Sequence, residues 1–391
     1  MKQARPHAVE DADPPADSSD GPQSDGPRMS ANDTLTSASG PQTSTNGSAQ
    51  AQLGLQSSAH APAAMHARES KPPGPARSTF RDYGLPLLLL AISVITTTAN
   101  GARFMQNFVE GLPPVVRDSD LWPWDWLADH PEMFKTGLPF SVALLGILLI
   151  HEFGHYFACR WHRIRCSLPW VLPAPTLSGT VGAVIKIGKR IPNRDALMDV
   201  GIYGPLAGYV ASAVAVGVGF ALSFHSAANA PKAIVVFGPE PLTIRLIHAL
   251  LVRWDPSIPS FDQIAPHPVL VAGWIGLFIT SLNLIPGGQL DGGHILYAVS
   301  PTAHKLFTSY LPIVLFLMGT VCWVGWMLWG IFLMVPAMRH PKVSVSPELS
   351  RGRLALAVIG LLIFLLTFTA TPFHNNSLMY LLHIDPFRST F

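Results

Sequence analysis

The stretch Gly137–Ala158 reads GLPFSVALLGILLIHEFGHYFA, an apolar segment long enough to cross a bilayer, yet it carries two histidines and a glutamate. On a helix, residues four apart share a face, so His151 and His155 can each offer a ring nitrogen to one metal ion. Glu152 lies about 100° further round, where its carboxylate can serve as general base for a water at that metal. Placing these polar groups in hydrocarbon costs a free energy on the order of several kcal/mol, unless metal ligation or another interaction compensates. We therefore predict a metal site inside a membrane-spanning helix; a pair of hydrogen-bonded core histidines is the alternative.

The composition favours a membrane protein with several spans. Of 391 residues, 49% are hydrophobic and only 13% are charged, whereas a soluble domain carries about 25% charged residues. The formal charge of +2 gives no reason to expect a nucleic-acid partner. The three cysteines (Cys159, Cys166 and Cys322) form no CxxC pair and predict no disulfide framework.

The chain divides into a polar tail and an apolar body. Residues 1–80 are rich in Ser, Ala, Pro and Gly, so we expect a disordered tail without a signal peptide. Residues 81–391 are expected to form an all-helical transmembrane domain of about seven spans, with its core near 137–296. The fifth and sixth spans can form either a tight hairpin or one long broken segment. The expected spans are Gly84–Arg103, Gly137–Ala158, Leu197–Phe224, Pro268–Ile285, His304–Thr320, Cys322–Ala337 and Leu354–Ala370.

Charges between the spans predict the orientation. Residues 159–194 carry seven basic residues and no acid, and the segments before the first span and after the sixth are also basic. The loop between the first two spans carries six acids against two basic residues. Basic loops stay in the cytoplasm, so seven spans predict a cytoplasmic N-terminus and an outer C-terminus, in a membrane such as the bacterial inner (plasma) membrane.

A second polar constellation ends the fourth expected span. Residues 283–294 read NLIPGGQLDGGH, in which Pro286 removes a backbone donor and the glycine pairs release the chain from helical geometry. A helix broken at membrane depth is tolerated where it lines protein or a water cavity. Asp291 is therefore the candidate third metal ligand, and Asn283 can hydrogen-bond a substrate carbonyl or a developing oxyanion.

These motifs resemble the site-2 proteases, which are intramembrane zinc metalloproteases. The shared elements are His-Glu-x-x-His in one span, Asn-x-x-Pro and Leu-Asp-Gly in a later one, and Gly204–Gly208 (GPLAG) between them. The resemblance implies Zn²⁺ held by His151, His155 and Asp291, with Glu152 as catalytic base and Asn283 assisting substrate binding. It also implies a membrane-protein substrate within the lipid bilayer, and leaves the oligomeric state open.

Three further segments refine the resemblance. Small residues in Gly204–Gly208 favour close helix packing over substrate contact. The broken apolar loop Leu168–Ile187 is either a membrane-associated hairpin that takes up the substrate as an added strand, as the resemblance suggests, or a simple interfacial loop. The segment from about His225 to His267 is too short for a PDZ domain, which places the chain nearer the bacterial and chloroplast-type relatives.

Two polar residues are expected to have structural roles outside the metal site. Asp199 is expected to cap a helix rather than to bind metal, and His294 to be an interfacial histidine rather than a partner of a metal ligand.

The alternative to a protease is a metal-holding membrane transporter or scaffold. Transporters more often show repeated spans with matching polar interruptions, which this sequence lacks, and a pure carrier has no use for Glu152.

Overall fold

A computed structural model describes residues 80–188, 191–225, 240–258, 263–338, 340–341, 343, 348–373 and 376–382. The expected tail, residues 1–80, lies outside the described residues but for Phe80. The described chain is mostly helical, which confirms the helical part of the expected fold class. Its helices are α1 (Leu85–Val109, preceded by a short π-helix, Phe80–Gly84), α2 (Trp124–Asp129), α3 (Leu138–Trp161), α4 (Arg194–Leu222), α5 (Leu242–Trp254), α6 (Pro268–Asn283), α7 (Asp291–Val299), α8 (Pro301–Val321), α9 (Gly325–Met334), α10 (Arg351–Thr367) and α11 (Leu378–Leu381).

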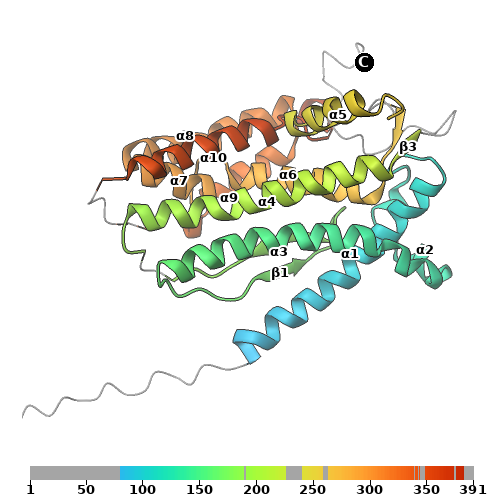
Figure 1. Ribbon diagram of the computed structural model, residues 1–391, viewed down its shortest axis with the longest axis horizontal. Helices are drawn as coiled ribbons and strands as arrows, with labels where there is room; N and C mark the ends of the chain where they lie inside the picture. Colours follow the sequence, from blue (N-terminus) through green and yellow to red (C-terminus); the bar gives the residue numbers. More distant parts are fainter. Residues whose placement is uncertain are drawn as a thin grey trace, which may run out of the picture. The chain divides into compact units, whose positions relative to one another are not determined.

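Helix α4 lies at the centre, with α3 and α6 packed along it and α1 crossing them at an angle (Figure 1). Glycines set the α4–α6 distance, because a Cβ at Gly219 would lie 2.4 Å from the Leu270 backbone and one at Gly273 would lie 2.8 Å from Val216. A Cβ at Gly276 would likewise lie 2.4 Å from the Ser212 hydroxyl. Small residues of this kind let helices approach closely where lipid supplies no hydrophobic drive.

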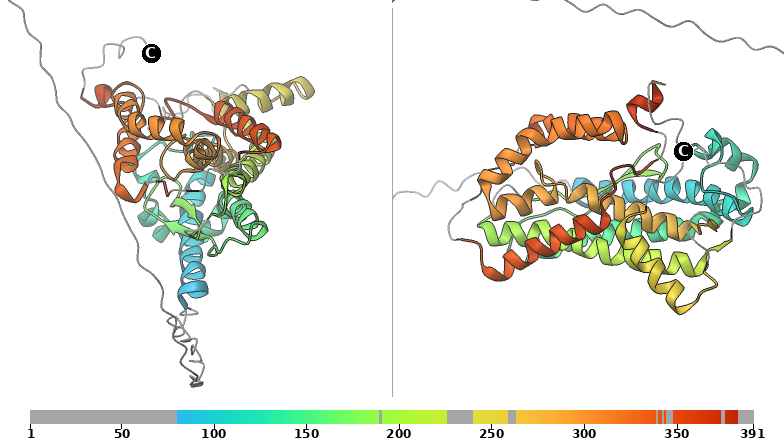
Figure 2. Two further views of the ribbon diagram at one scale, coloured as in Figure 1. Left: turned by 90° about the vertical axis from the view of Figure 1, so that its left-hand side faces the viewer. Right: turned by 90° about the horizontal axis from the view of Figure 1, so that it is seen from above.

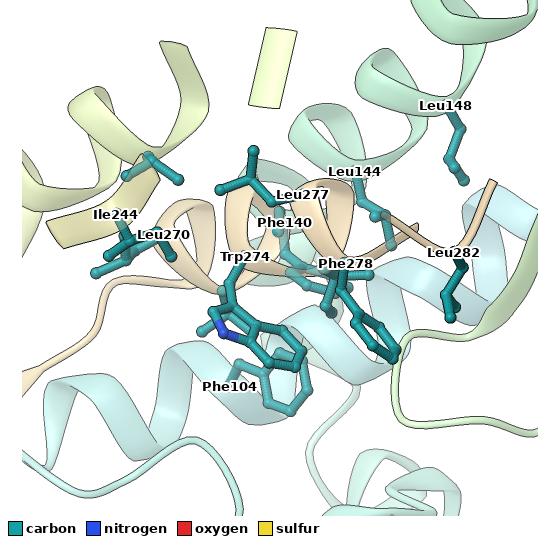
Figure 3. Close-up of a cluster of buried hydrophobic side chains, with 14 of the residues drawn as sticks. Phe104, Phe140, Leu144, Leu148, Ile244, Leu270, Trp274, Leu277, Phe278 and Leu282 are labelled. Carbon is teal, nitrogen blue, oxygen red and sulfur yellow. The ribbon is translucent and has the colours of Figure 1, made fainter. Parts of the chain in front are cut away.

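Aromatic and aliphatic side chains fill the space between α1, α3 and α6 (Figure 3). The rings of Phe104 and Phe140 meet edge to face with centroids 5.1 Å apart, and Trp274 stacks on Phe278 at 5.5 Å. Offset and edge-to-face ring pairs of this kind stabilise a core beyond the area that they bury. This cluster fixes α3 and α6, the two helices that lead to the polar residues of interest.

A β-hairpin lies against α1. Strands β1 (Trp170–Pro173) and β2 (Thr180–Val184) are antiparallel, with Trp170 opposite Val184. Polar side chains of α1 hold the turn between the strands: Thr96 Oγ1 donates to the Gly179 carbonyl at 2.7 Å, and Asn100 Nδ2 to the Thr176 carbonyl at 2.8 Å. Of the two interpretations of Leu168–Ile187, the structure therefore has the hairpin. A second pair is minimal, β3 (Phe224–His225) with β4 (Ile264–Ala265).

The segment after α1 is anchored by one buried carboxylate. Asp120 is 1% exposed and accepts hydrogen bonds from Arg103 Nε at 2.7 Å, Asn107 Nδ2 at 3.1 Å and the backbone amide of Val116 at 2.7 Å. Burial would raise the pKa of Asp120, but the amides of Arg117 and Val116 and the Arg103 guanidinium together lower it below its usual range. The carboxylate therefore stays charged and closes the loop back onto α1.

The expected spans need two corrections. Within the described residues, four helices are long and apolar enough to cross a membrane: 82–109, 131–161, 194–222 and 301–321. The fourth expected span, Pro268–Ile285, is wrong as a full crossing, because α6 has 16 residues and ends at Asn283. Sixteen residues reach about 24 Å, less than the ~30 Å of hydrocarbon. Helix α5 was not expected in the sequence at all.

The fifth and sixth expected spans are two helices packed as a hairpin, the first of the two alternatives. Helices α8 and α9 contact each other closely, since a Cβ at Gly330 would lie 2.8 Å from the Pro312 carbonyl oxygen. Figure 2 shows this orange pair from two further sides.

The expectation that Asp199 caps a helix is wrong. Helix α4 begins at Arg194, and the cap is Asn193, whose side chain accepts from the Ala196 amide at 2.9 Å. Asp199 lies inside the helix, 4% exposed, and accepts from Arg353 Nη2 and His162 Nε2, both at 2.7 Å. It thus joins α4 to α10 and to the end of α3.

Candidate metal centre

Helix α3 presents His151 and His155 on one face, and both side chains are buried at 4% exposure. Asp291 is the first residue of α7, which begins after the broken segment that follows α6. The structure brings the three together, with Asp291 Oδ2 3.3 Å from the Nε2 atom of each histidine and the two Nε2 atoms 3.2 Å apart. Among the described residues this is the one cluster of metal-binding side chains with its ligand atoms so close.

The triangle of ligand atoms fits a tetrahedral metal ion. Zinc binds imidazole nitrogen and carboxylate oxygen at about 2.0–2.2 Å, and the edge of such a tetrahedron is about 3.3 Å. The three observed separations, 3.2 to 3.3 Å, match that edge. A set of two imidazoles and one carboxylate leaves the fourth position open, as catalytic zinc sites require.

The backbone of α4 fixes how the His155 ring is presented. His155 Nδ1 lies 2.6 Å from the carbonyl oxygen of Val200, to which it donates, so that Nε2 keeps a lone pair for a metal. Sequence reasoning missed Val200, because a backbone acceptor leaves no trace in residue identity. The signal that could have found it is its place one turn before Gly204.

Gly204 and Gly208 make room for the two imidazoles. A Cβ at Gly204 would lie 2.1 Å from His155 Nε2, and one at Gly208 would lie 2.6 Å from His151 Nδ1. The expected packing role of Gly204–Gly208 is therefore more specific than helix contact alone, since these two glycines face the histidine rings. A side chain at either position would displace the ring that it meets.

The break between α6 and α7 is compact enough to return Asp291 to α3. Gly288 has a φ of +58°, a left-handed conformation that glycine adopts without strain. A Cβ at Gly292 would lie 2.0 Å from the Leu284 carbonyl oxygen, so the start of α7 packs directly on the end of α6. Asn283, the last residue of α6, places Nδ2 3.4 Å from His151 Nε2, beside the open side of the cluster.

Glu152 is 5% exposed and lies near both imidazoles and Asp291. The backbone amide of Ile185, the residue after strand β2, lies close to this carboxylate, and β2 contacts α3. The hairpin and the metal cluster are therefore neighbours. The other edge of β2 pairs with no strand among the residues that the structure describes.

His294 lies one turn after Asp291 and is 8% exposed. Its Nδ1 is 2.8 Å from His340 Nε2, and the two rings meet edge to face. The expectation of an interfacial histidine is therefore wrong: His294 is buried, pairs with the half-buried His340 and is not a member of the cluster.

Comparison with known proteins agrees with this geometry. Residues 139–324 match the sequence model of Peptidase family M50, which confirms the resemblance to site-2 proteases. The chain is 26% identical over 315 residues to the "Probable zinc metalloprotease EGY1, chloroplastic" of Arabidopsis thaliana, covering 78% of this chain and 55% of that protein. It is 28% identical over 316 residues to the protein of the same name from Oryza sativa subsp. japonica, covering 78% of this chain and 52% of the relative. The chain thus spans about half the length of the curated relatives that it matches.

Proposed function

Because residues 139–324 match the sequence model of Peptidase family M50, we propose that this protein is an intramembrane zinc metalloendopeptidase that cleaves transmembrane or membrane-proximal peptide bonds. The observation that carries the proposal is the buried triangle of His151, His155 and Asp291, with edges of 3.2 to 3.3 Å, in apolar helical surroundings. Buried ionisable groups in such surroundings are costly and are retained for function.

In this proposal His151 Nε2, His155 Nε2 and one Asp291 oxygen hold Zn²⁺. Bound there, zinc would act as a Lewis acid that polarises the scissile carbonyl and eases deprotonation of water. The Val200 carbonyl keeps the His155 ring in the tautomer that leaves Nε2 available. Buried walls exclude bulk water, so the polar groups act in a medium of low dielectric constant.

Glu152 acts as the general base. It takes a proton from the attacking water and passes it to the leaving nitrogen. Asn283 Nδ2, close to His151, is positioned to donate to the substrate carbonyl oxygen as negative charge develops on it.

Strand β2 is the proposed docking edge for the substrate. A peptide bond inside a helix is shielded, so the segment must be extended before attack, and strand addition supplies that geometry. The unpaired edge of β2 continues to Ile185, whose amide lies at Glu152. An added strand would therefore pass next to the general base.

For the whole chain we propose residues 1–80 as a disordered tail and 81–391 as the catalytic domain with about seven crossings. The fourth crossing would be shared by α6, the break and α7. The N-terminus would be cytoplasmic, in a bacterial inner (plasma) membrane. Basic residues between 159 and 194 support this orientation.

The substitution Glu152→Gln tests the function. It is nearly isosteric but cannot accept the proton of water, and loss of a general base typically costs about 10²–10⁴-fold in rate. We expect cleavage of a membrane-inserted model substrate to fall by this factor, while the zinc content stays near one ion per chain. As the comparison, Asp291→Ala should lose both zinc and cleavage.

Two outcomes would contradict the proposal. If Glu152→Gln with zinc bound cleaved at the parental rate, the protein would be a metal-holding transporter or scaffold instead. If Asp291→Ala kept a full complement of zinc, Asp291 would leave the ligand set.

A further inference from the structure

A groove of about 580 Å³ runs between α3 and α4 on a face that contains neither metal-binding histidine. Its walls carry large apolar side chains that are well exposed, among them Phe157 and Trp161. Its floor is made of small residues from both helices. The lining is Ile150, Gly154, Phe157, Ala158, Trp161, Tyr203, Leu206, Ala207, Val210 and Ala211.

The groove is narrow, because its two helices touch. A Cβ at Gly154 would lie 2.4 Å from the Tyr203 carbonyl oxygen, so no gap separates α3 from α4 beneath it. A helix with side chains is about 10–12 Å across and would rest on the rim rather than enter. A flexible hydrocarbon chain is thin enough to lie along such a groove.

The length of the groove matches one leaflet. From Ile150 to Trp161 the rise along α3 is about 17 Å, and half of a ~30 Å hydrocarbon core is about 15 Å. The open end is therefore expected at the interface, where Trp161, at 74% exposure, has the amphipathic ring typical of that depth.

The interfacial end of the groove is cationic. Arg160 and Arg163 flank Trp161, both are exposed, and neither side chain forms an ion pair with any residue that the structure describes. The carboxylate of Asp199 on α4 is already paired with Arg353 and hydrogen-bonded to His162. Basic pockets between membrane helices attract anionic headgroups.

We propose that this groove is a binding site for an anionic phospholipid, with one acyl chain between α3 and α4 and the headgroup phosphate at Arg160 and Arg163. The site is separate from the peptidase chemistry, so it can be tested whether or not the protein cleaves peptides. The bound chain would cover the outer side of the helix pair that carries His155 and Gly204.

Native mass spectrometry of the purified full chain tests the site. The probes are phosphatidylglycerol and phosphatidylcholine with identical acyl chains, and glycerophosphoglycerol, which has the headgroup alone. We expect at least fivefold more retained phosphatidylglycerol than phosphatidylcholine, and no competition by the soluble headgroup. Equal retention of the two lipids, or displacement by glycerophosphoglycerol or inorganic phosphate, would overturn the proposal.

Variants distinguish the contribution of the lipid's acyl chain from that of its headgroup. Ala207→Phe fills the floor and should abolish the retained lipid, whereas Val214→Phe, at an exposed position two turns further along α4, should not. Arg160→Gln with Arg163→Gln should remove the preference for phosphatidylglycerol, whereas Lys305→Gln, an exposed cation on α8, should keep it. Zinc content and thermal midpoint report whether each variant is folded.

A photoreactive amino acid in place of Ala211 identifies by crosslinking what occupies the groove. Crosslinks to lipid agree with the proposal, while crosslinks to a co-purifying peptide would show that a protein segment fills the groove and would overturn it. Undiminished lipid retention by folded Ala207→Phe would overturn it as well.

Discussion

The His155 ring is constrained by main-chain atoms more than by other side chains. On one side the Val200 carbonyl accepts from Nδ1 at 2.6 Å, and on another the bare Cα of Gly204 leaves the space that Nε2 occupies. Both constraints come from one turn of α4. The orientation of the ring therefore depends on the register between α3 and α4, because a shift of one residue would replace glycine by a side chain.

The substitution Gly204→Ala tests this constraint. The new methyl would lie 2.1 Å from His155 Nε2, so the ring must turn away. Disturbing groups that orient a metal ligand typically costs about 10–100-fold in affinity, and we expect at least that loss in a zinc competition titration. The control is Gly217→Ala on the same helix, where a Cβ meets nothing within 4 Å. Equal zinc affinity in the two variants would show that the ring has another stable position.

Helix α10 lies outside the region that matches the peptidase family, yet it is tied to the metal-bearing part of the fold. Arg353, near its start, donates from Nε to Asp199 Oδ1 at 3.0 Å and from Nη2 to Asp199 Oδ2 at 2.7 Å. Asp199 immediately precedes Val200. The two-pronged contact thus positions the turn of α4 that holds His155.

Replacing Arg353 by Gln should loosen that turn. The variant leaves the Asp199 carboxylate with His162 as its remaining partner, and a buried charged group that loses a partner costs about 1–3 kcal/mol. We expect a lower thermal midpoint in detergent and weaker zinc binding. Arg351→Gln, an exposed neighbour on the same helix, should change neither. A stability loss with unchanged zinc affinity would make the contact purely structural.

The sequence predicted some of these elements and not others, for physical reasons. Long apolar runs such as α3 and α4 were found because length and hydropathy alone determine them. Helix α5 was missed, since its 13 residues are too short and too mixed in polarity to resemble a crossing. Pro286 and the glycine pairs predict the break after α6, but the packing of Gly292 on Leu284, which brings α7 back onto α6, is a tertiary contact that one-dimensional hydropathy cannot contain.

The residues of the candidate site were predictable from the sequence, but the groups that hold them in position were not. His151, His155 and Asp291 stand out because polar groups are rare in apolar segments. Asp199 was misread because its partner Arg353 lies 154 residues away. Val200 acts through its carbonyl, a group that every residue has.

At the scale of the whole molecule, loop charge predicts opposite locations for the two ends. Reporter fusions before residue 81 and at the C-terminus should read cytoplasm and outer side, respectively. The reason is the cluster of basic residues between 159 and 194, which resists translocation. Same-side readings would mean an even number of crossings, the simplest case being that α6, the break and α7 do not together traverse the membrane.

Removing residues 1–77 should leave the chemistry intact. Their composition provides too few large apolar side chains to build a core that could support the centre. A chain starting at Ser78 is expected to insert, to hold zinc and to cleave a model substrate at close to the full-length rate. Loss of zinc together with a lower thermal midpoint would mean that the tail contributes to the fold.

The proposed metal ligands are separated by 140 residues of chain, between His151 and Asp291. At about 5–20 residues per second of synthesis, roughly 7–28 s pass between the appearance of the histidine pair and that of the carboxylate. During that interval a nascent chain already inserted through α3 has no complete triad. The order of translation therefore delays assembly of the proposed active site until α7 has been synthesised.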